Sequence, residues 1–281
     1  MHRVALVTDS ASDITPQLAQ ALDVTVVSLL VYFGEEELRA VDLPPDQFWA
    51  RMTAPGATLP RTAACSPADF QAAFEGCFEQ GAEAIICVTV GGKLSATLKS
   101  AQIAAEQLKD REVHVIDSDC ASMGQVLLLQ VAAGLRDAGE PAAAIAARVQ
   151  ERVVDLKFYV ALETLEYLRR GGRITTAQAA IGSVLSVKPI ISIEDGVVVQ
   201  ADRVRTRSKA RERLLELITS RPLDRLAVLH GMAPDIEAFA ADLTARAGLE
   251  PDRVTVAAIG PSIGPHVGPG SYGAVCLYRP A

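Results

Sequence analysis

The segment 260–273, GPSIGPHVGPGSYG, holds residue types that could carry out two kinds of chemistry. Its first five residues fit the G-x-S-x-G pattern of serine hydrolases, in which Ser262 would be the nucleophile. Its last six residues, GPGSYG, fit the G-x-G-x-x-G pattern that binds dinucleotides. His266, one of only four histidines, lies between the two patterns and could act as a base or face an anion.

Neither pattern has the surroundings that its chemistry needs. A nucleophile elbow joins a strand to a helix, and Pro265 and Pro269 should prevent a helix from forming after Ser262. His266 is also too close in sequence to serve as the base across such an elbow. A dinucleotide motif opens a helix, whereas the eight residues after Gly273 are typical of a strand. We therefore expect an irregular loop whose backbone approaches an anion.

Further candidates lie where regular structure is expected to begin or end: Asp9, Ser10, Thr62, Gly91, Gly92 and Ser95. Asp9 follows the first apolar run, and ligands of open parallel sheets bind beyond the carboxyl ends of strands. Gly91 and Gly92 precede an expected helix, where backbone N–H groups can bind an anion, although Ser95 could simply cap that helix. Thr62 is an ordinary loop hydroxyl unless a ligand lies beside it.

Basic residues gather in two clusters although the chain carries a net charge of −7. The clusters are Arg169, Arg170 and Arg173, and then Arg203, Arg205, Arg207, Lys209, Arg211 and Arg213. A solvated surface is the ordinary interpretation, and a face that docks an acidic or phosphorylated partner is the alternative. The negative net charge argues against a protein devoted to nucleic acid.

The composition favours a cytoplasmic protein. The five cysteines are scattered without a CxxC pair, which is typical of free thiols in a reducing compartment. No His/Cys/Asp spacing supports a metal site. The N-terminus reaches Asp9 after a short apolar run, so we expect no signal peptide. No run of about 18 apolar residues exists, so we expect no membrane span.

Alternating strands and helices are expected to position the candidates of the first half. Short apolar runs predict strands at 4–8, 24–31, 84–89 and 112–116. Helical segments are expected at 67–80, 94–108, 121–137 and 142–154. This alternation predicts a parallel, Rossmann-like sheet with helices on both faces. We place a domain boundary after the last of these helices, giving domains 1–153 and 154–281.

The second half should form an α+β domain with a mixed or antiparallel sheet. Asp195-Gly196 between two β-rich runs predicts a hairpin, because both turn positions need a positive φ. Strands are expected at 158–162, 187–194, 197–204, 226–230, 254–259 and 274–278. Helices are expected at 165–170, from Ile174 onward, and at 207–220 and 236–247.

Taken together, these motifs resemble the DegV family. The matching segments are 7–12 (VTDSAS), 94–97 (LSAT) with 100–101, 117–118, 165–174 (LEYLRRGGRI), 188–190, 204–206 and 266–270 (HVGPG). They occur in order and span nearly the entire chain. The resemblance implies a two-domain α/β protein that binds one long-chain fatty acid, such as palmitate, in a buried tunnel between and within its domains. It also implies a carrier rather than an enzyme.

The resemblance implies a partner as well as a ligand. Related bacterial proteins look like the acyl-carrying subunit of a fatty acid kinase, whose ATP-binding partner makes acyl phosphate for phospholipid synthesis. Transient membrane contact is compatible with such a carrier. Residues that would face the head group or the partner are Asp9, Ser10, Arg170, Arg173, Arg205 and Arg207.

By motif, the fatty-acid carboxylate contacts fall on Thr62, on the turn that holds Gly91, Gly92 and Ser95, and on His266. The chain departs from the family pattern at this turn, where two serines are common and the second, here Gly92, would face the carboxylate. We expect the glycine N–H groups to remain available as donors. We also expect a bound carboxylate to raise the pKa of His266.

Two alternatives stay open. One is an enzyme, either a hydrolase that uses Ser262 and His266 or a transferase that uses the glycine-rich loop. The other is a lipid sensor that keeps the tunnel but has no kinase partner.

Overall fold

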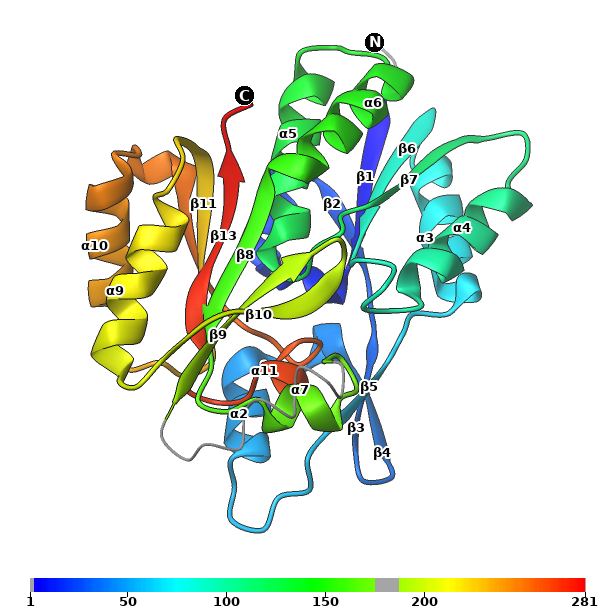
Figure 1. Cartoon of the computed structure of the whole chain (residues 1–281). Helices are drawn as coiled ribbons and strands as arrows, with labels where there is room; N and C mark the ends of the chain where they lie inside the picture. The colour runs from blue at the N-terminus through cyan, green and yellow to red at the C-terminus, as the bar shows by residue number, and fades with distance from the viewer. Residues whose placement is uncertain (1–2, 175–186, 281) are drawn as a thin grey trace.

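A four-stranded parallel sheet forms the first half of the protein, in a computed structural model that describes residues 3–174 and 187–280. Its strands lie in the order β2 (Val24–Val27), β1 (Val4–Asp9), β6 (Ala84–Thr89) and β7 (Glu112–Asp117). Two helices cover one face, α3 (Pro67–Glu79) and α4 (Thr97–Gln107), and two cover the other, α5 (Met123–Asp137) and α6 (Ala142–Arg152) (Figure 1). The predicted Rossmann-like arrangement is confirmed.

A six-stranded mixed sheet forms the second half. Its strands lie in the order β10 (Val197–Val204), β9 (Lys188–Glu194), β8 (Leu156–Ala161), β13 (Tyr272–Tyr278), β11 (Leu223–His230) and β12 (Val254–Ala258). Only the pair β11–β12 is parallel. The predicted hairpin joins β9 to β10, and its turn residues Asp195 and Gly196 have φ values of 49° and 72°. Helices α9 (Arg207–Ile218) and α10 (Ile236–Ala247) cover the outer face.

A third, small sheet was not predicted. It is antiparallel and contains β3 (Leu30–Phe33), β4 (Glu36–Arg39) and β5 (Arg61–Ala63), with α2 (Pro45–Met52) beside it. The single strand expected at 24–31 is therefore wrong: the chain leaves the parallel sheet after Val27 and enters the small sheet at Leu30. A continuous apolar run does not show where a chain passes from one sheet to another, since both strands are equally apolar. This small sheet carries Thr62.

The expectation that prolines would prevent a helix after Ser262 is also wrong. A one-turn helix, α11 (Gly264–Val267), forms there with Pro265 in its first turn. Proline is tolerated in that position because the N–H that it lacks would have no partner within the helix. The helix expected at 94–108 begins only at Thr97, as α4. The helix expected from Ile174 onward lies outside the described residues.

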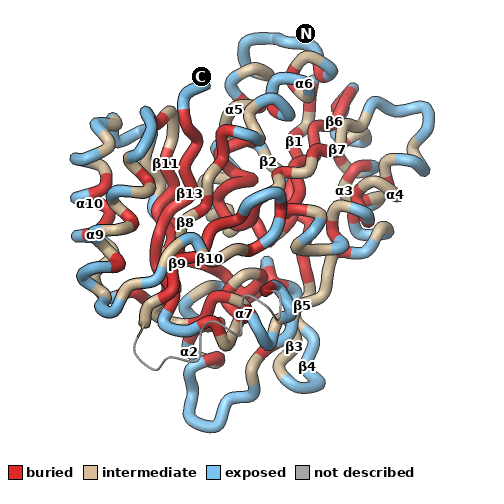
Figure 2. Tube along the Cα trace, viewed as in Figure 1, coloured by how far each residue is buried: buried red, intermediate tan, exposed pale blue. Residues whose placement is uncertain are grey.

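The apolar core is continuous between the two sheets. Helix α5 contacts β1 and β6 on one side and β8, β11 and β13 on the other, so it packs between the sheets. Figure 2 shows the buried tube segments running from the parallel sheet through α5 into the mixed sheet. A second cluster of apolar side chains lies between the mixed sheet and helices α9 and α10. The mixed sheet begins at Leu156, and we keep 153/154 as the proposed domain boundary.

The remaining elements are short. They are η1 (Ser10–Ser12), α1 (Pro16–Leu22), η2 (Ala40–Asp42), η3 (Val153–Asp155), α7 (Glu166–Arg170) and η5 (Pro251–Arg253). Helix α7 contacts α11, and the two lie together below the mixed sheet in Figure 1. This pair of helices forms one wall of the site described next.

Candidate ligand-binding site

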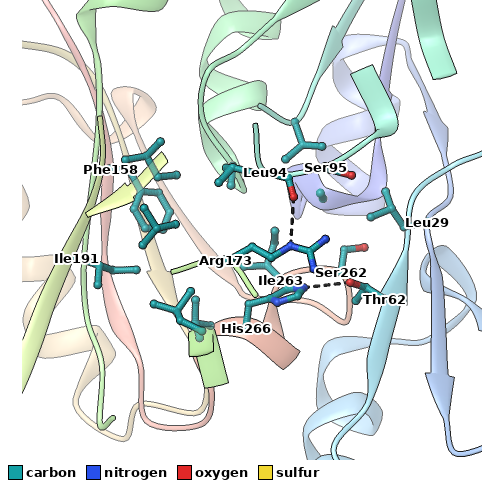
Figure 3. A pocket seen from close by; sticks show the side chains of 17 residues that line it. Leu29, Thr62, Leu94, Ser95, Phe158, Arg173, Ile191, Ser262, Ile263 and His266 are labelled. Atoms are coloured by element: carbon teal, nitrogen blue, oxygen red, sulfur yellow. Dashed lines mark hydrogen bonds between the residues drawn. The ribbon is translucent and has the colours of Figure 1, made fainter. Parts of the chain in front are cut away.

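A mostly apolar cavity lies where the carboxyl ends of the parallel strands meet the mixed sheet. At one end it is lined by Phe158, Ile191, Ile193 and Val198, from β8, β9 and β10. At the other end, shown in Figure 3, polar groups converge: Thr62, Ser95, Arg173, Ser262 and His266. The cavity offers about 70 Å³ to the centres of water-sized molecules. Its apolar body and polar end fit a ligand with a long apolar part and a polar head group.

The polar end is organised by a hydrogen bond between two distant parts of the chain. The Thr62 hydroxyl on β5 lies 3.0 Å from Nε2 of His266 on α11 (Figure 3). Strand β5 is held by its pairing with β3, in which Thr62 is opposite Val31. The predicted pair of head-group residues is therefore brought together by the small sheet and by the one-turn helix.

Glycines allow α11 to pack closely against its neighbours. A Cβ atom on Gly264 would lie 2.3 Å from the Phe48 ring, on α2. A Cβ atom on Gly171, which follows α7, would lie 2.3 Å from Nδ1 of His266. Real Cβ contacts are essentially never that short, so glycine at position 264 leaves room for the Phe48 ring and glycine at position 171 leaves room for the imidazole.

We expect Gly171→Ala to displace His266 and weaken ligand binding about tenfold, since overpacking costs about 1–3 kcal/mol. The backbone at Gly171 has φ −72°, so alanine brings a steric conflict without backbone strain. Gly134→Ala on α5 is the matched control, because a Cβ atom there meets nothing within 4 Å. Binding of a fluorescent fatty acid measures the effect. Equal affinities in the two variants would show that the imidazole position is not critical.

Burial controls the protonation of His266. Burial, together with the nearby Arg173 guanidinium, lowers its pKa to about 4. The expected rise in pKa is therefore not produced by the protein itself, because the groups around the imidazole disfavour its charge. The Nδ1 atom is buried and has no hydrogen-bond partner among the described residues. At neutral pH, His266 is an uncharged imidazole whose second nitrogen is unused.

Arg173 places a positive charge at the polar end of the cavity. Its Nε donates to the carbonyl of Leu94 at 3.2 Å, and its Nη1 donates to the carbonyl of Gly171 at 2.6 Å. Both acceptors are neutral, so these bonds hold the guanidinium without neutralising it. Of the six residues expected to face a head group or partner, Arg173 is the one that lines the cavity.

Gly91 and Gly92, in the β6–α4 connection, do not offer free N–H groups to a ligand. The N–H of Gly91 donates to the carbonyl of Cys120 at 2.8 Å, and the N–H of Gly92 donates to the Asp117 carboxylate at 3.1 Å. A Cβ atom on Gly92 would meet Leu98 and Asp117 and would not point into the cavity. The expectation of free N–H donors is wrong, because the loop uses both groups to hold itself together.

Ser95 from the same connection does line the cavity. Its hydroxyl lies 2.9 Å from the Thr97 hydroxyl and also accepts the Thr97 N–H at 3.3 Å. This contact fixes the first turn of α4, and the hydroxyl keeps a further lone pair. Ser95 therefore accepts one N–H of the first turn of α4, although Ala96 is the N-cap residue, and it also lies at the polar end.

Asp9 and Ser10 support the site from behind. Asp9 is fully buried, and its carboxylate accepts the N–H groups of Val90 and Ala11. Burial raises the pKa of Asp9 to about 6. An enclosed residue cannot contact a partner, so that expectation is wrong for Asp9. Ser10 accepts the Leu29 N–H and lies 2.9 Å from the Ser262 hydroxyl.

The Ser10–Ser262 contact also bears on the hydrolase alternative. Ser262 is paired with another hydroxyl, and His266 is paired with Thr62. Within the described residues, no hydrogen bond joins Ser262 to His266 or to any other base. A serine without a base is a weak nucleophile. The same region contains no group of His, Cys, Asp and Glu side chains that could hold a metal ion.

The remaining arginine candidates lie away from the cavity body. Arg170 is exposed and donates to Glu166 at 2.7 Å. Arg207 forms ion pairs with Asp235 and Glu163 and stacks over a tyrosine ring, so it is held by its own domain. Arg205 is exposed. The proposed docking face therefore keeps Arg170 and Arg205, while Arg207 has a structural role.

Sequence reasoning missed one residue that fixes the site. Asp13 accepts the Gly260 N–H at 2.9 Å and the Ser122 hydroxyl at 2.5 Å. Gly260 precedes α11, and its carbonyl accepts the N–H groups of Ile263 and Gly264. The Asp13 carboxyl group thus anchors the segment that carries His266. Only its position next to the 7–12 motif could have drawn attention to it.

Comparison with known proteins agrees with this geometry. A family model described as "Uncharacterised protein, DegV family" matches residues 3–279. The chain belongs to the DegV family. A DegV domain-containing protein of Deinococcus radiodurans is 35% identical, with 96% of each chain covered. The resemblance recognised from the sequence is confirmed.

Solved DegV structures share the fold along the whole chain. One, described as "Fatty Acid Binding of a DegV family Protein from Thermus thermophilus", is 32% identical, covers 99% of this chain and 100% of its own, and has a TM-score of 0.87. Another, a stearic-acid-binding protein from Eubacterium ventriosum, is 26% identical with a TM-score of 0.88, and the match covers 99% of this chain and 98% of its own. Both are described by what they bind and not by a reaction. In the described ranges, no helix is long and apolar enough to span a membrane.

Proposed function

We propose that this DegV protein is a carrier, not an enzyme, that binds one long-chain fatty acid in the cavity. The carboxylate occupies the polar end beside Thr62, Arg173 and His266, and the alkyl chain extends between β8, β9 and β10. The observation that carries this proposal is the convergence of these three groups, together with the hydroxyls of Ser95 and Ser262, at one end of a mostly apolar cavity. The fatty-acid-binding relatives support the same ligand class.

The polar end offers a carboxylate both hydrogen bonds and charge. His266 Nε2–H can donate to the Thr62 oxygen, which leaves the Thr62 O–H free to donate to the ligand. The Arg173 guanidinium supplies the opposite charge that a carboxylate needs in a site of low dielectric constant. A bound carboxylate favours the imidazolium form, so ligand binding should raise the low pKa of His266 and be accompanied by proton uptake.

The alkyl chain should supply most of the affinity. Burial of about fourteen methylenes, as in palmitate, contributes roughly 11 kcal/mol at ~0.8 kcal/mol each, before ordering costs. One hydrogen bond at the head group contributes only about 1 kcal/mol net. Gly91 and Gly92, which stand where two serines are common in the family, therefore need not abolish binding through the loss of those hydroxyls.

We expect His266→Ala to weaken fatty-acid binding about tenfold without abolishing it, since the hydrogen bond that directs the Thr62 O–H toward the charged carboxylate is lost. His230→Ala is the matched control, because His230 lies on β11 and does not line the cavity. Titration with a fluorescent fatty acid measures both affinities. Unchanged binding in His266→Ala would contradict the placement of the head group at this end.

We further propose that a partner kinase phosphorylates the bound acid for phospholipid synthesis. A carboxylate oxygen would bond to the γ-phosphorus of ATP while the bond to the leaving ADP breaks. The exposed Arg170 and Arg205 are the proposed partner face. The five cysteines are all buried free thiols, which supports a cytoplasmic location. A lipid sensor without a kinase would instead bind the same acid and never yield acyl phosphate.

Native mass spectrometry of the purified protein tests the central proposal, followed by extraction and identification of any bound molecule. We expect one fatty acid of about C14–C18 per chain, a range that includes the palmitate used for the burial estimate above. A protein that is isolated empty and also fails to take up added palmitate would contradict the proposed function.

A further inference from the structure

Ser262, the serine of the G-x-S-x-G pattern, lines the fatty-acid cavity, and its hydroxyl is paired with another hydroxyl rather than with a base. It is 2% exposed, and the apolar side chains of Ala11, Leu29 and Ile263 line the cavity with it. A buried hydroxyl needs hydrogen-bond partners, because burial removes those that water would supply. The groups that bond to Ser262 therefore bear on which head group the polar end accepts.

The Ser10–Ser262 pair keeps one O–H group without an acceptor. The two hydroxyl oxygens lie 2.9 Å apart, so one hydroxyl donates to the other, and Ser10 also accepts the Leu29 N–H at 2.9 Å. The pair has two hydrogens, and the contact between the hydroxyls uses one of them. Among the described residues, neither hydroxyl has a further acceptor. When Ser10 donates, the unused O–H is that of Ser262, which is the member of the pair that lines the cavity.

Ser95, at the same polar end, also keeps one unused hydrogen-bonding position. Its oxygen lies 2.9 Å from the Thr97 hydroxyl and accepts the Thr97 N–H at 3.3 Å. A hydroxyl donates once and accepts twice, so two of its three positions are used. Figure 3 shows Ser95 and Ser262 at the same end as Thr62 and Arg173. The polar end therefore has two hydroxyl groups beyond the Thr62 and Arg173 contacts that the proposed carboxylate uses.

We propose that the ligand is a hydroxy fatty acid, whose hydroxyl group on the second or third carbon accepts the Ser262 O–H. The proposal rests on the proposed function for the carboxylate and the tail. A methylene group beside Ser262 cannot accept this hydrogen, so an unsubstituted acid would leave a buried donor without a partner. A ligand hydroxyl also has a hydrogen of its own to donate, to Ser95 or back to a Ser262 lone pair. A second carboxylate would instead place two negative charges beside the single guanidinium of Arg173.

Competition against a fluorescent fatty acid on the full chain tests this proposal with three probes: palmitate, 2-hydroxypalmitate and 3-hydroxypalmitate. We expect the wild-type protein to bind one of the hydroxy acids about tenfold more tightly than palmitate. Ser262→Ala should remove this preference and leave the palmitate affinity unchanged. Ser220→Ala is the matched control, because Ser220 is exposed, donates to the Leu217 carbonyl and does not line the cavity. The preference is a ratio measured on one variant, so partial unfolding of that variant does not alter it.

The outcomes separate this proposal from the proposed function. If palmitate binds the wild-type protein as tightly as both hydroxy acids, the hydroxy-acid proposal alone is overturned. An equal loss of affinity for all three acids in Ser262→Ala would assign the Ser262 hydroxyl to the carboxylate, and it would also overturn the proposal. A preference that persists in Ser262→Ala would show that another residue binds the ligand hydroxyl. If none of the three acids binds the wild-type protein, the proposed function itself fails, and this proposal fails with it.

Discussion

Val198→Asp should reduce fatty-acid affinity at least about 100-fold. Val198 lies on β10, is 7% exposed and lines the apolar part of the cavity. A carboxylate at this position would lose its hydration when an alkyl chain lies against it, and burial of an unpaired charge costs several kcal/mol. Since tail burial is expected to dominate the affinity, a charge beside the tail should have a larger effect than the loss of any head-group contact.

Val197→Asp is the matched control for this experiment. Adjacent residues of a strand point to opposite sides, and Val197 is 40% exposed and does not line the cavity. Fluorescent fatty-acid titration and native mass spectrometry would be run on both variants, with thermal unfolding to confirm that each is folded. Similar affinities of Val198→Asp and wild type would place the alkyl chain elsewhere and refute the cavity assignment.

Asp13→Asn should stabilise the protein at pH 8, by up to about 4 kcal/mol, and have little effect near pH 4. Burial and, to a smaller extent, the charge of Asp9 raise the pKa of Asp13 from 3.8 to about 7, although the hydrogen bonds from Ser122 and Gly260 lower it. The folded protein thus binds this proton more tightly than the unfolded chain. Folding stability therefore falls as the pH rises from about 4 through about 7, when the buried carboxyl group must ionise.

Asparagine removes that charge but keeps the contacts. Its Oδ1 can accept the Gly260 N–H, and its Nδ2 can donate to the Ser122 hydroxyl. Asp13 has φ 53°, a left-handed conformation that asparagine adopts more readily than most residues. Urea unfolding between pH 4.5 and 8 measures the effect, with Asp110→Asn in an exposed loop as the control. If the free energies of unfolding of Asp13→Asn and wild type change in parallel with pH, this carboxyl group does not titrate as proposed.

The Asp13 experiment bears on how the polar end of the site is held in place. Asp13 anchors the segment before α11, and glycines 171 and 264 allow that helix to pack against α7 and α2. The imidazole of His266 is therefore positioned by contacts with three separate segments of the chain. A ligand that enters the cavity meets a preformed polar end. Binding therefore costs little additional side-chain entropy at that end.

The sequence by itself determined the fold class and the family, and it predicted the two residues of the proposed head-group site. Strand–helix alternation predicted the parallel sheet, and Asp195-Gly196 predicted the hairpin, because these features depend on local periodicity and on φ preferences. Thr62 and His266 were predicted to contact the same carboxylate, and the structure places them 3.0 Å apart. The family motifs carried that prediction, since no local pattern relates two residues this far apart in the chain.

Tertiary structure alone decided which polar groups are available to a ligand. Gly91 and Gly92 have N–H groups that any loop could offer, yet Cys120 and Asp117 accept them after the β6–α4 and β7–α5 connections come together. Arg173 was one of six equal candidates until the fold placed it at the polar end. The low pKa of His266 likewise depends on burial and on a neighbouring charge. Each of these properties arises from contacts between distant segments, which composition and spacing do not specify.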